Sequence, residues 1–137
     1  MTSQRNRTGA APGKTRQDLV ARTSRFGVDV ITFARAVRPD AVTRPLISQL
    51  VRAATSVGAN YSEANEAESR LDFRHKISIC AKEARETQHW FHMLVAACPD
   101  RKAETRALWS EARELNLIFG AIVRSCSTPK GNTGKET

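Results

Sequence analysis

The chain has 137 residues, of which 40% are hydrophobic, so it is long enough for one domain with a buried core and short for two. No run approaches the roughly 20 apolar residues that cross a bilayer, and no apolar segment follows the basic N-terminal residues as in a secretory signal, so we expect a cytoplasmic protein without membrane contact. The formal net charge of +8 excludes a neutral surface and points to polyanionic partners.

The two ends of the chain have the composition of disordered tails. Residues 1–16 contain four basic side chains and no acidic one, namely Arg5, Arg7, Lys14 and Arg16. Residues 127–137 are similarly rich in Thr, Gly and Ser, and such segments bury too little apolar surface to become ordered. Basic arms of this kind either contact nucleic acid or act as solubilising ends, and both interpretations stay open. We therefore predict one domain over residues 17–126.

Between the tails, core-type positions recur at alternating steps of three and four residues in four segments. They are Leu19, Thr23, Phe26, Val30, Phe33 and Val37; Ile47, Leu50, Ala54, Val57, Tyr61 and Ala64; Phe73, Ile77, Cys80, Ala84, Thr87, Phe91, Leu94 and Cys98; and Leu108, Ala112, Leu115, Phe119, Ile122 and Cys126. This spacing defines the seam along which helices pack. Short links containing Pro-Asp make successive helices antiparallel. The sequence predicts an all-α protein, an antiparallel up-down-up-down four-helix bundle.

Helix boundaries are indicated by capping residues and prolines. Thr15-x-x-Asp18 and Ser69-x-x-Asp72 resemble capping boxes with Asp in place of Glu. Asp100 can cap the fourth helix, and Pro45 suits the first turn of the second.

The second segment contains "VGANYSEANEAE", residues 57–68, which is an unusual sequence for a helix interior. We expect Gly58, beside the seam, to let a neighbouring helix approach closely. Four polar residues share an arc roughly 130° from that seam, namely Arg52, Ser56, Asn60 and Glu63. They are interpreted as a polar contact with another helix, the alternative being a solvated stripe.

The third segment has a second apolar strip, formed by Ile79, Trp90 and Ala97, roughly 110° from its seam. It is either part of a wide core face or a subunit interface, and the size of Trp90 favours self-association. Glu86 and Trp90 therefore join the predicted oligomer or inter-helix contact residues.

Two basic stripes are candidate phosphate-binding surfaces. The third segment collects Arg74, Ser78, Lys82, Arg85, His89 and His92 within one arc, and the fourth aligns Lys102, Arg106 and Arg113 with Trp109. Cations with an aromatic side chain between them are typical of nucleic-acid contacts. We predict that nucleic acid binds at Arg74, Lys82, Arg85, Lys102, Arg106 and Arg113, the alternative being solvated charged faces.

Catalytic and metal-binding arrangements are not indicated. Glu86-x-x-His89 has the spacing of di-iron bundles, but the nearest second motif, Asp72-x-x-His75, is on the same helix, and its histidine is about 21 Å away along the axis. The three cysteines, Cys80, Cys98 and Cys126, have no zinc-binding spacing. We expect neither an enzyme nor a cofactor.

The second and third segments resemble a known bacterial family. The stretch "QLVRAATSVGANYSEANEAESRLDFRHKISICAKEARETQHWF" is similar to the signature of the bacterial four helix bundle family, first noted as proteins encoded in intervening sequences of large-subunit ribosomal RNA genes. The matching positions are Gln49, Leu50, Arg52, Ala53, Ser56, Asn60, Glu63, Asp72, Phe73, Ile79 and Glu86. The likeness covers roughly residues 17–126. The chain departs from the pattern at Ala64, where Gly is usual, and at Lys82-Glu83, where Gly-Ser is usual.

The resemblance implies an antiparallel four-helix bundle that forms a homopentamer in characterised relatives. One branch, the accessory variability determinant of diversity-generating retroelements, is basic, binds nucleic acid and partners a reverse transcriptase. The branch encoded in ribosomal RNA intervening sequences has no established activity. Our leading hypothesis is thus a non-enzymatic oligomeric accessory protein that binds RNA or DNA, with a reverse transcriptase as a possible partner. The alternative is a protein-interaction scaffold encoded in a ribosomal RNA intervening sequence.

Overall fold

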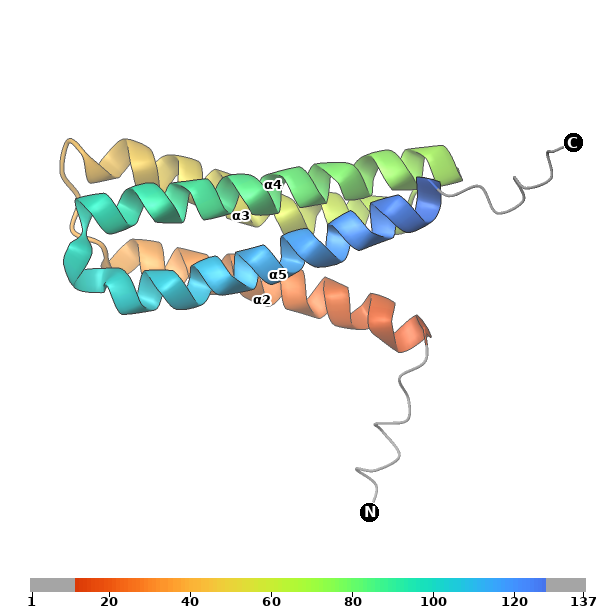
Figure 1. Ribbon diagram of the computed structural model, residues 1–137, viewed down its shortest axis with the longest axis horizontal. Coiled ribbons are helices and arrows are strands. Elements are labelled where there is room, and N and C mark those ends of the chain that lie inside the picture. Colours follow the sequence, from red (N-terminus) through yellow and green to blue (C-terminus); the bar gives the residue numbers. More distant parts are fainter. Residues whose placement is uncertain (1–11, 128–137) are drawn as a thin grey trace, which may run out of the picture.

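Residues 12–127 are described by a computed structural model, and they form the predicted four-helix bundle (Figure 1). The elements are α2 (Pro12–Ala36), α3 (Thr43–Asn65), α4 (Arg70–Ala97), the short 3-10 helix η1 (Pro99–Arg101) and α5 (Lys102–Ser127). Within this part of the chain there is no strand, and no helix has the length and apolar character needed to cross a membrane. The all-α fold class is confirmed.

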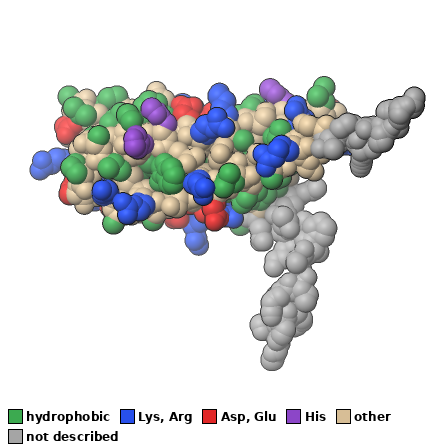
Figure 2. All heavy atoms as spheres, viewed as in Figure 1, with side chains coloured by type: hydrophobic (Ala, Val, Ile, Leu, Met, Phe, Trp, Pro, Cys, Tyr) green, Lys and Arg blue, Asp and Glu red, His purple; other side chains and the backbone are tan. Residues whose placement is uncertain are grey.

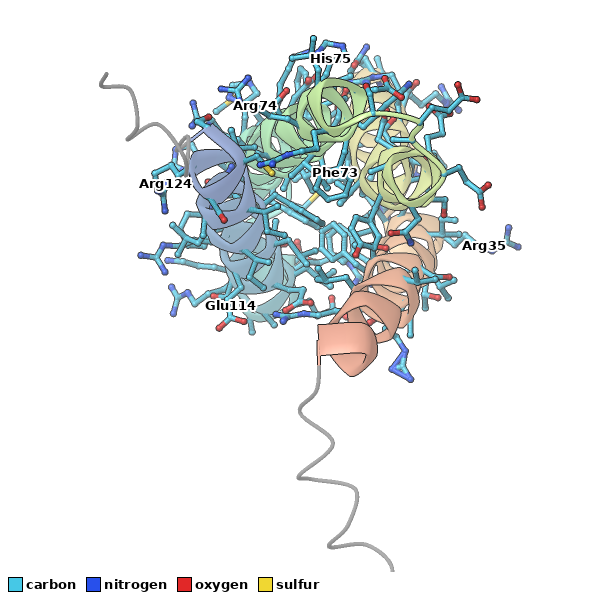
Figure 3. The ribbon with its side chains drawn as sticks, turned by 90° about the vertical axis from the view of Figure 1, so that its right-hand side faces the viewer. Arg35, Phe73, Arg74, His75, Glu114 and Arg124 are labelled. Atoms are coloured by element: carbon cyan, nitrogen blue, oxygen red, sulfur yellow. The ribbon has the colours of Figure 1, made fainter. Side chains whose placement is uncertain are left out.

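Short connections make each helix antiparallel to the one before it. The helices pack as α2 on α3, α3 on α4 and α4 on α5, whereas α5 contacts α2 only sparsely. In Figure 1, α2 diverges from α5 toward the N-terminal end of α2, and Figure 3, turned by 90°, shows the same separation. The ring of four helices is therefore closed least tightly between its first and last members.

The core consists of the predicted seam positions. The five seam residues of α2 and Val37, directly after its end, are buried. Elsewhere the half-buried seam residues lie near helix ends, namely Ile47, Phe73, Cys98, Leu108, Ile122 and Cys126. Phe33 packs edge-on against Phe91 with ring centroids 5.7 Å apart, and Tyr61 lies 5.6 Å from Phe119. Burying each large apolar side chain stabilises the fold by about 1.5–3 kcal/mol. The alternation of three and four residues thus identified the buried face correctly.

Polar groups within the core are satisfied by neighbouring backbone. The Thr23 hydroxyl donates to the Leu19 carbonyl at 2.8 Å, and the Thr87 hydroxyl donates to the Glu83 carbonyl at 2.7 Å. Such bonds to the preceding turn let threonine occupy a buried helical position without an unpaired hydroxyl. Burial also raises the pKa of the Cys80 thiol to about 12, so this cysteine is neutral and unreactive at physiological pH.

The helix boundaries agree with the sequence at some ends and differ at others. The Ser69 hydroxyl accepts from the Asp72 backbone N–H at 3.0 Å, as predicted for the start of α4, and Pro45 lies in the first turn of α3. In contrast, α2 begins at Pro12 and includes the last five residues of the expected tail, because proline fits a first helical position. The remainder of the predicted tails, residues 1–11 and 128–137, lies outside the described residues.

An unpredicted cap starts α3. The Asp40 carboxylate accepts from the backbone N–H groups of Val42 and Thr43, both at 2.8 Å. These bonds, first that from Thr43 and then that from Val42, hold the pKa of Asp40 below its usual value. The turn between α2 and α3 is therefore fixed by a charged side chain that the sequence marked only as a helix break.

Of the described glycines, Gly58 has the least room for a side chain, because α2 passes close to it. A Cβ at this position would come within 3.3 Å of the Thr23 hydroxyl oxygen and 3.4 Å of the Thr23 carbonyl oxygen. An alanine would therefore require α2 to move by a few tenths of an ångström. The expectation that this glycine allows close helix packing is confirmed.

Candidate nucleic-acid interface

Helix α5 presents flanks of opposite charge to its two neighbours. On the side of α2, Arg22 donates from Nε to Glu111 at 2.7 Å and from Nη2 to Glu114 at 2.6 Å. These contacts, led by the hydrogen bond with Glu111, raise the pKa of Arg22 despite its partial burial. In Figure 3 Glu114 projects from the side of α5 nearer α2, whereas Arg74 and Arg124 lie on the opposite, outer side. The acids of α5 thus face α2, and its basic stripe faces away.

The basic stripe of α5 borders a groove shared with α4. This α4–α5 groove, with a volume of about 530 Å³, is lined by Phe91, His92, Val95, Lys102, Thr105, Arg106, Trp109 and Ser110. Trp109 is half-buried and packs against the core, so its indole is held in place by the fold. Apolar side chains therefore line a groove whose charged residues are both basic.

Helix α4 adds cations on the same side of the molecule, at positions spread along its length from the groove to the far end of the bundle. Arg74 lies near the end of α5, where its Nε donates to the Ser127 hydroxyl at 2.7 Å, and Arg85 is exposed. The Asn116 amide donates to the Ala81 carbonyl at 2.7 Å and fixes the two helices in register. We name the surface formed by Arg74, Arg85, Lys102, Arg106, Trp109 and Arg113 the α4–α5 face. Figure 2 views the side on which α4 and α5 lie, and shows Lys, Arg and His side chains spread along it with only scattered Asp and Glu.

The fold places most of the predicted basic residues on one side of the bundle, with Arg74 at the opposite end of that side from Lys102. Five of the six predicted positions belong to the α4–α5 face, and the sixth, Lys82, lies on the outer ridge of α4 by its helical position. Among the side chains of residues 19–127, no carboxylate lies within the ion-pairing distance of 4.0 Å from Arg85, Lys102, Arg106 or Arg113. These cations remain available to an external anion.

Metal binding has no geometric basis in the part of the chain that the structure describes. Among the side chains described, those of residues 19–127, no group of three or more His, Cys, Asp or Glu is placed to hold a metal ion. Glu86, the carboxylate of the Glu86-x-x-His89 motif, accepts hydrogen bonds from Arg52 and Trp90.

Comparison with known proteins identifies the family. The sequence model of the family described as 23S rRNA-intervening sequence protein matches residues 16–120, which is more than half of the chain. The chain belongs to this family. Its structure is similar to the crystal structure of a protein of unknown function from the S23 ribosomal protein family of Bacteroides thetaiotaomicron, with 26% identity and a TM-score of 0.72 over 80% of this chain and 98% of that one. No curated protein matches the chain.

As a 23S rRNA-intervening sequence protein, this chain has an unusual polar network between α3 and α4. Arg52 donates to Glu83 at 3.3 Å and also to Glu86, and the Trp90 indole N–H donates to Glu86 at 3.2 Å. Glu83 is buried, with 7% of its surface exposed. It belongs to the Lys82-Glu83 pair at which the chain departs from the family pattern, so the departure places a buried carboxylate beside Arg52.

The pKa of Glu86 reflects this network. Burial acts to raise it, but the hydrogen bonds from Trp90 and Arg52, with the charges of Arg52 and Lys82, lower it below the usual value. Glu86 is therefore held as a carboxylate at neutral pH.

The remaining predicted contact residues of α3 divide into two groups. Lys76 donates to Glu63 at 2.6 Å, so Glu63, like Arg52, joins α3 to α4 of the same chain. The Asn60 amide donates to the Ser56 carbonyl at 2.9 Å, within its own helix. The polar stripe of α3 thus contacts α4 at its two ends, through Arg52 and Glu63, and Asn60 makes a hydrogen bond within α3 between them.

The second apolar strip of α4 lies on the flank toward α3. Ile79, Trp90 and Ala97 are half-buried, and Trp90 packs against the core. His89 stacks edge-on against Trp90 with ring centroids 4.7 Å apart. More exposed apolar side chains lie on α2, where 40% of Val20, 56% of Val28 and 39% of Ile31 are accessible.

Proposed function

We propose that this protein is a non-enzymatic nucleic-acid-binding protein whose α4–α5 face contacts the phosphate backbone. The observation that carries this proposal is the group of cations along α4 and α5 that have no carboxylate partner among the described side chains. Several other basic side chains of the molecule form salt bridges with carboxylates, namely Arg22, Arg52, Lys76 and Arg101. Fixed cations on one face attract phosphates and release the counterions that surround them.

Binding should weaken steeply with salt. Each neutralised phosphate contributes a slope of about 0.9 for duplex or 0.7 for single strands to the fall of log affinity with log salt concentration. If the face contacts about four phosphates, we expect a slope near −3 to −4. Fluorescence anisotropy of a labelled oligonucleotide across a salt series measures it.

Two triple variants with the same charge change locate the site. We expect Lys102→Gln, Arg106→Gln and Arg113→Gln together to reduce affinity by about tenfold or more and to reduce the salt slope by about 2 to 3. The control carries Arg25→Gln, Arg35→Gln and Arg44→Gln, all exposed on α2 and α3. Equal losses in the two triples would show that binding follows net charge and that the α4–α5 face is not the site.

We also propose self-association, through the exposed apolar side chains of α2. Val20, Val28 and Ile31 border a groove between α2 and α3 that also includes Gly27, Gly58 and Ala59. Small residues leave room for a side chain of a second copy, as in close helix packing. We expect Val28→Glu with Ile31→Glu to lower the mass measured by light scattering; Val42→Glu, which replaces the exposed Val42 outside this groove, is the control. A wild-type chain that is monomeric would contradict this proposal.

The biological setting distinguishes two roles for such a protein. A nucleic-acid-binding accessory of a diversity-generating retroelement should be encoded near a reverse transcriptase and a template repeat. A protein-interaction scaffold of the ribosomal branch should be encoded inside a ribosomal RNA gene. The DNA flanking the gene tests both, and copurification with a reverse transcriptase would support the first.

A further inference from the structure

We propose that the α4–α5 groove is a binding site for one unpaired nucleotide base, which stacks on Trp109 while Lys102, Arg106 and Arg113 hold the flanking phosphates. This inference rests on the proposed function and adds a substrate class to it. The protein should select single-stranded RNA or DNA over duplex.

The groove has the composition that a base requires. Val95 and Trp109 supply apolar surface above the buried Phe91, and His92 and Ser110 add polar groups at the same site. Trp109 is half-buried, so the core restrains one part of the indole while another part borders the groove. An aromatic ring restrained in this way loses little freedom when a base stacks on it, and every base offers a face for stacking.

The cations are ordered along α5 around the indole. With a rise of 1.5 Å per residue, Arg106 precedes Trp109 by about 4.5 Å along the axis and Arg113 follows it by about 6 Å. Lys102 lies about 6 Å before Arg106. A strand that follows the helix therefore meets phosphate contacts on both sides of the stacking position, which matches the repeat of phosphate, base and phosphate.

A duplex cannot present its bases to this groove. Its major groove is about 12 Å wide, which admits one helix. Helices α4 and α5 lie side by side, and two packed helices with axes about 8–10 Å apart are together roughly 20 Å across. Duplex phosphates can reach Lys102 and Arg106, but the paired bases stay stacked inside and do not reach Trp109.

Fluorescence of Trp109 reports base stacking directly. The chain has two tryptophans, so Trp90→Phe leaves Trp109 as the only one. Three probes of equal length are compared, namely single-stranded oligo-dT, an abasic oligonucleotide and a duplex. We expect quenching with oligo-dT alone and an affinity for the abasic strand lower by about tenfold, since stacking of one base contributes from about fivefold to about a hundredfold to affinity.

Substitution of Trp109 completes the test. Trp109→Leu in the otherwise unchanged chain should lower the affinity for oligo-dT by about tenfold and leave the affinity for the abasic strand unchanged. Trp109→Phe keeps an aromatic ring, so it should still bind oligo-dT more tightly than the abasic strand, by a smaller factor than the unsubstituted chain. A variant that has lost its fold would lose both affinities, and a thermal melt followed by circular dichroism identifies it; Trp109→Phe then decides.

The possible outcomes separate this inference from the proposed function. Equal affinity for oligo-dT and the abasic strand, or binding without quenching, overturns the base site and leaves phosphate binding standing. If a polyglutamate peptide quenches Trp109 and binds as tightly as oligo-dT, the groove accepts acidic protein segments. That result also overturns the base site. Absence of binding to all three oligonucleotides at low salt overturns the proposed function and this inference together.

Discussion

Arg22 of α2 and Glu111 of α5 form a two-point ion pair, with Nε and Nη2 of the arginine 2.7 and 2.9 Å from the two carboxylate oxygens. The residues are 89 positions apart in the chain and join the two neighbouring helices of the bundle that otherwise contact each other least. About a third of each side chain is exposed, so solvent weakens the pair without removing it.

Removing this pair should loosen α2. We expect Arg22→Gln to lower the free energy of unfolding by about 0.5–1 kcal/mol, and a double-mutant cycle with Glu111→Gln to give a coupling of similar size. Urea unfolding measures both, and hydrogen exchange in α2 should accelerate. Arg25→Gln, one turn away and exposed, is the control; a coupling of zero would mean that packing alone holds α2 against α5.

Two glycines should respond in opposite ways to alanine. At Gly27 a Cβ would make ordinary contact with Thr55, 3.7 Å from its Cγ2, so Gly27→Ala should stabilise by about 0.5–1 kcal/mol through helix propensity. Gly58→Ala should gain no stability, because its Cβ would crowd the Thr23 backbone. Thermal melts of the two variants test this difference, and a similar stabilisation at both sites would show that α2 moves without cost.

Arg52 should be needed mainly because Glu83 is buried. We expect Arg52→Ala to destabilise by about 1–3 kcal/mol, since it leaves this carboxylate without its charged partner. Adding Glu83→Ser, which restores a small residue of the family pattern, should recover most of the loss. Chemical denaturation of the two variants checks the prediction, and additive losses in the double variant would contradict it.

The Asp40 cap predicts a specific dependence on pH. Its pKa is lower in the folded chain than in the unfolded one, so the stability that it contributes is complete above the ordinary carboxyl pKa of 3.8 and is lost as the pH falls through the lower, folded value. Asp40→Ala should melt at a lower temperature than the unsubstituted chain at neutral pH, and the gap should close under acid. A gap that persists at the lowest pH would indicate that the cap does not depend on the carboxylate charge.

The seam of each helix could be predicted from sequence because burial follows the helical period. Leu50, Val57 and Phe119 are completely buried at predicted positions, and Gly58 is a close-packing point as expected. The start of α2 was placed too late, since Thr15 and Asp18 resemble a cap although Pro12 can already begin a helix. Local patterns therefore gave the faces of the helices better than their ends.

The partners of charged residues could not be predicted in the same way. The polar stripe containing Arg52 and Glu63 was recognised as a contact, but its partner, α4, depends on the rotation of packed helices. The pair of Arg22 with Glu111 has no local signal, because it forms only once the first and last helices meet. The members of the basic stripes could be predicted from their helical spacing, whereas only the fold shows that His92 and Trp109 line one groove.

The opposite charges on the two flanks of α5 also bear on how a partner arrives. Glu111 and Glu114 lie toward α2, while Lys102 and Arg106 line the groove with α4 and Arg113 shares their side of α5 by its helical position. Charges separated across a helix create a field that turns the whole molecule as it diffuses near a polyanion. The protein should meet a nucleic-acid chain with its α4–α5 face already leading, so encounters are faster at low ionic strength than random orientation allows.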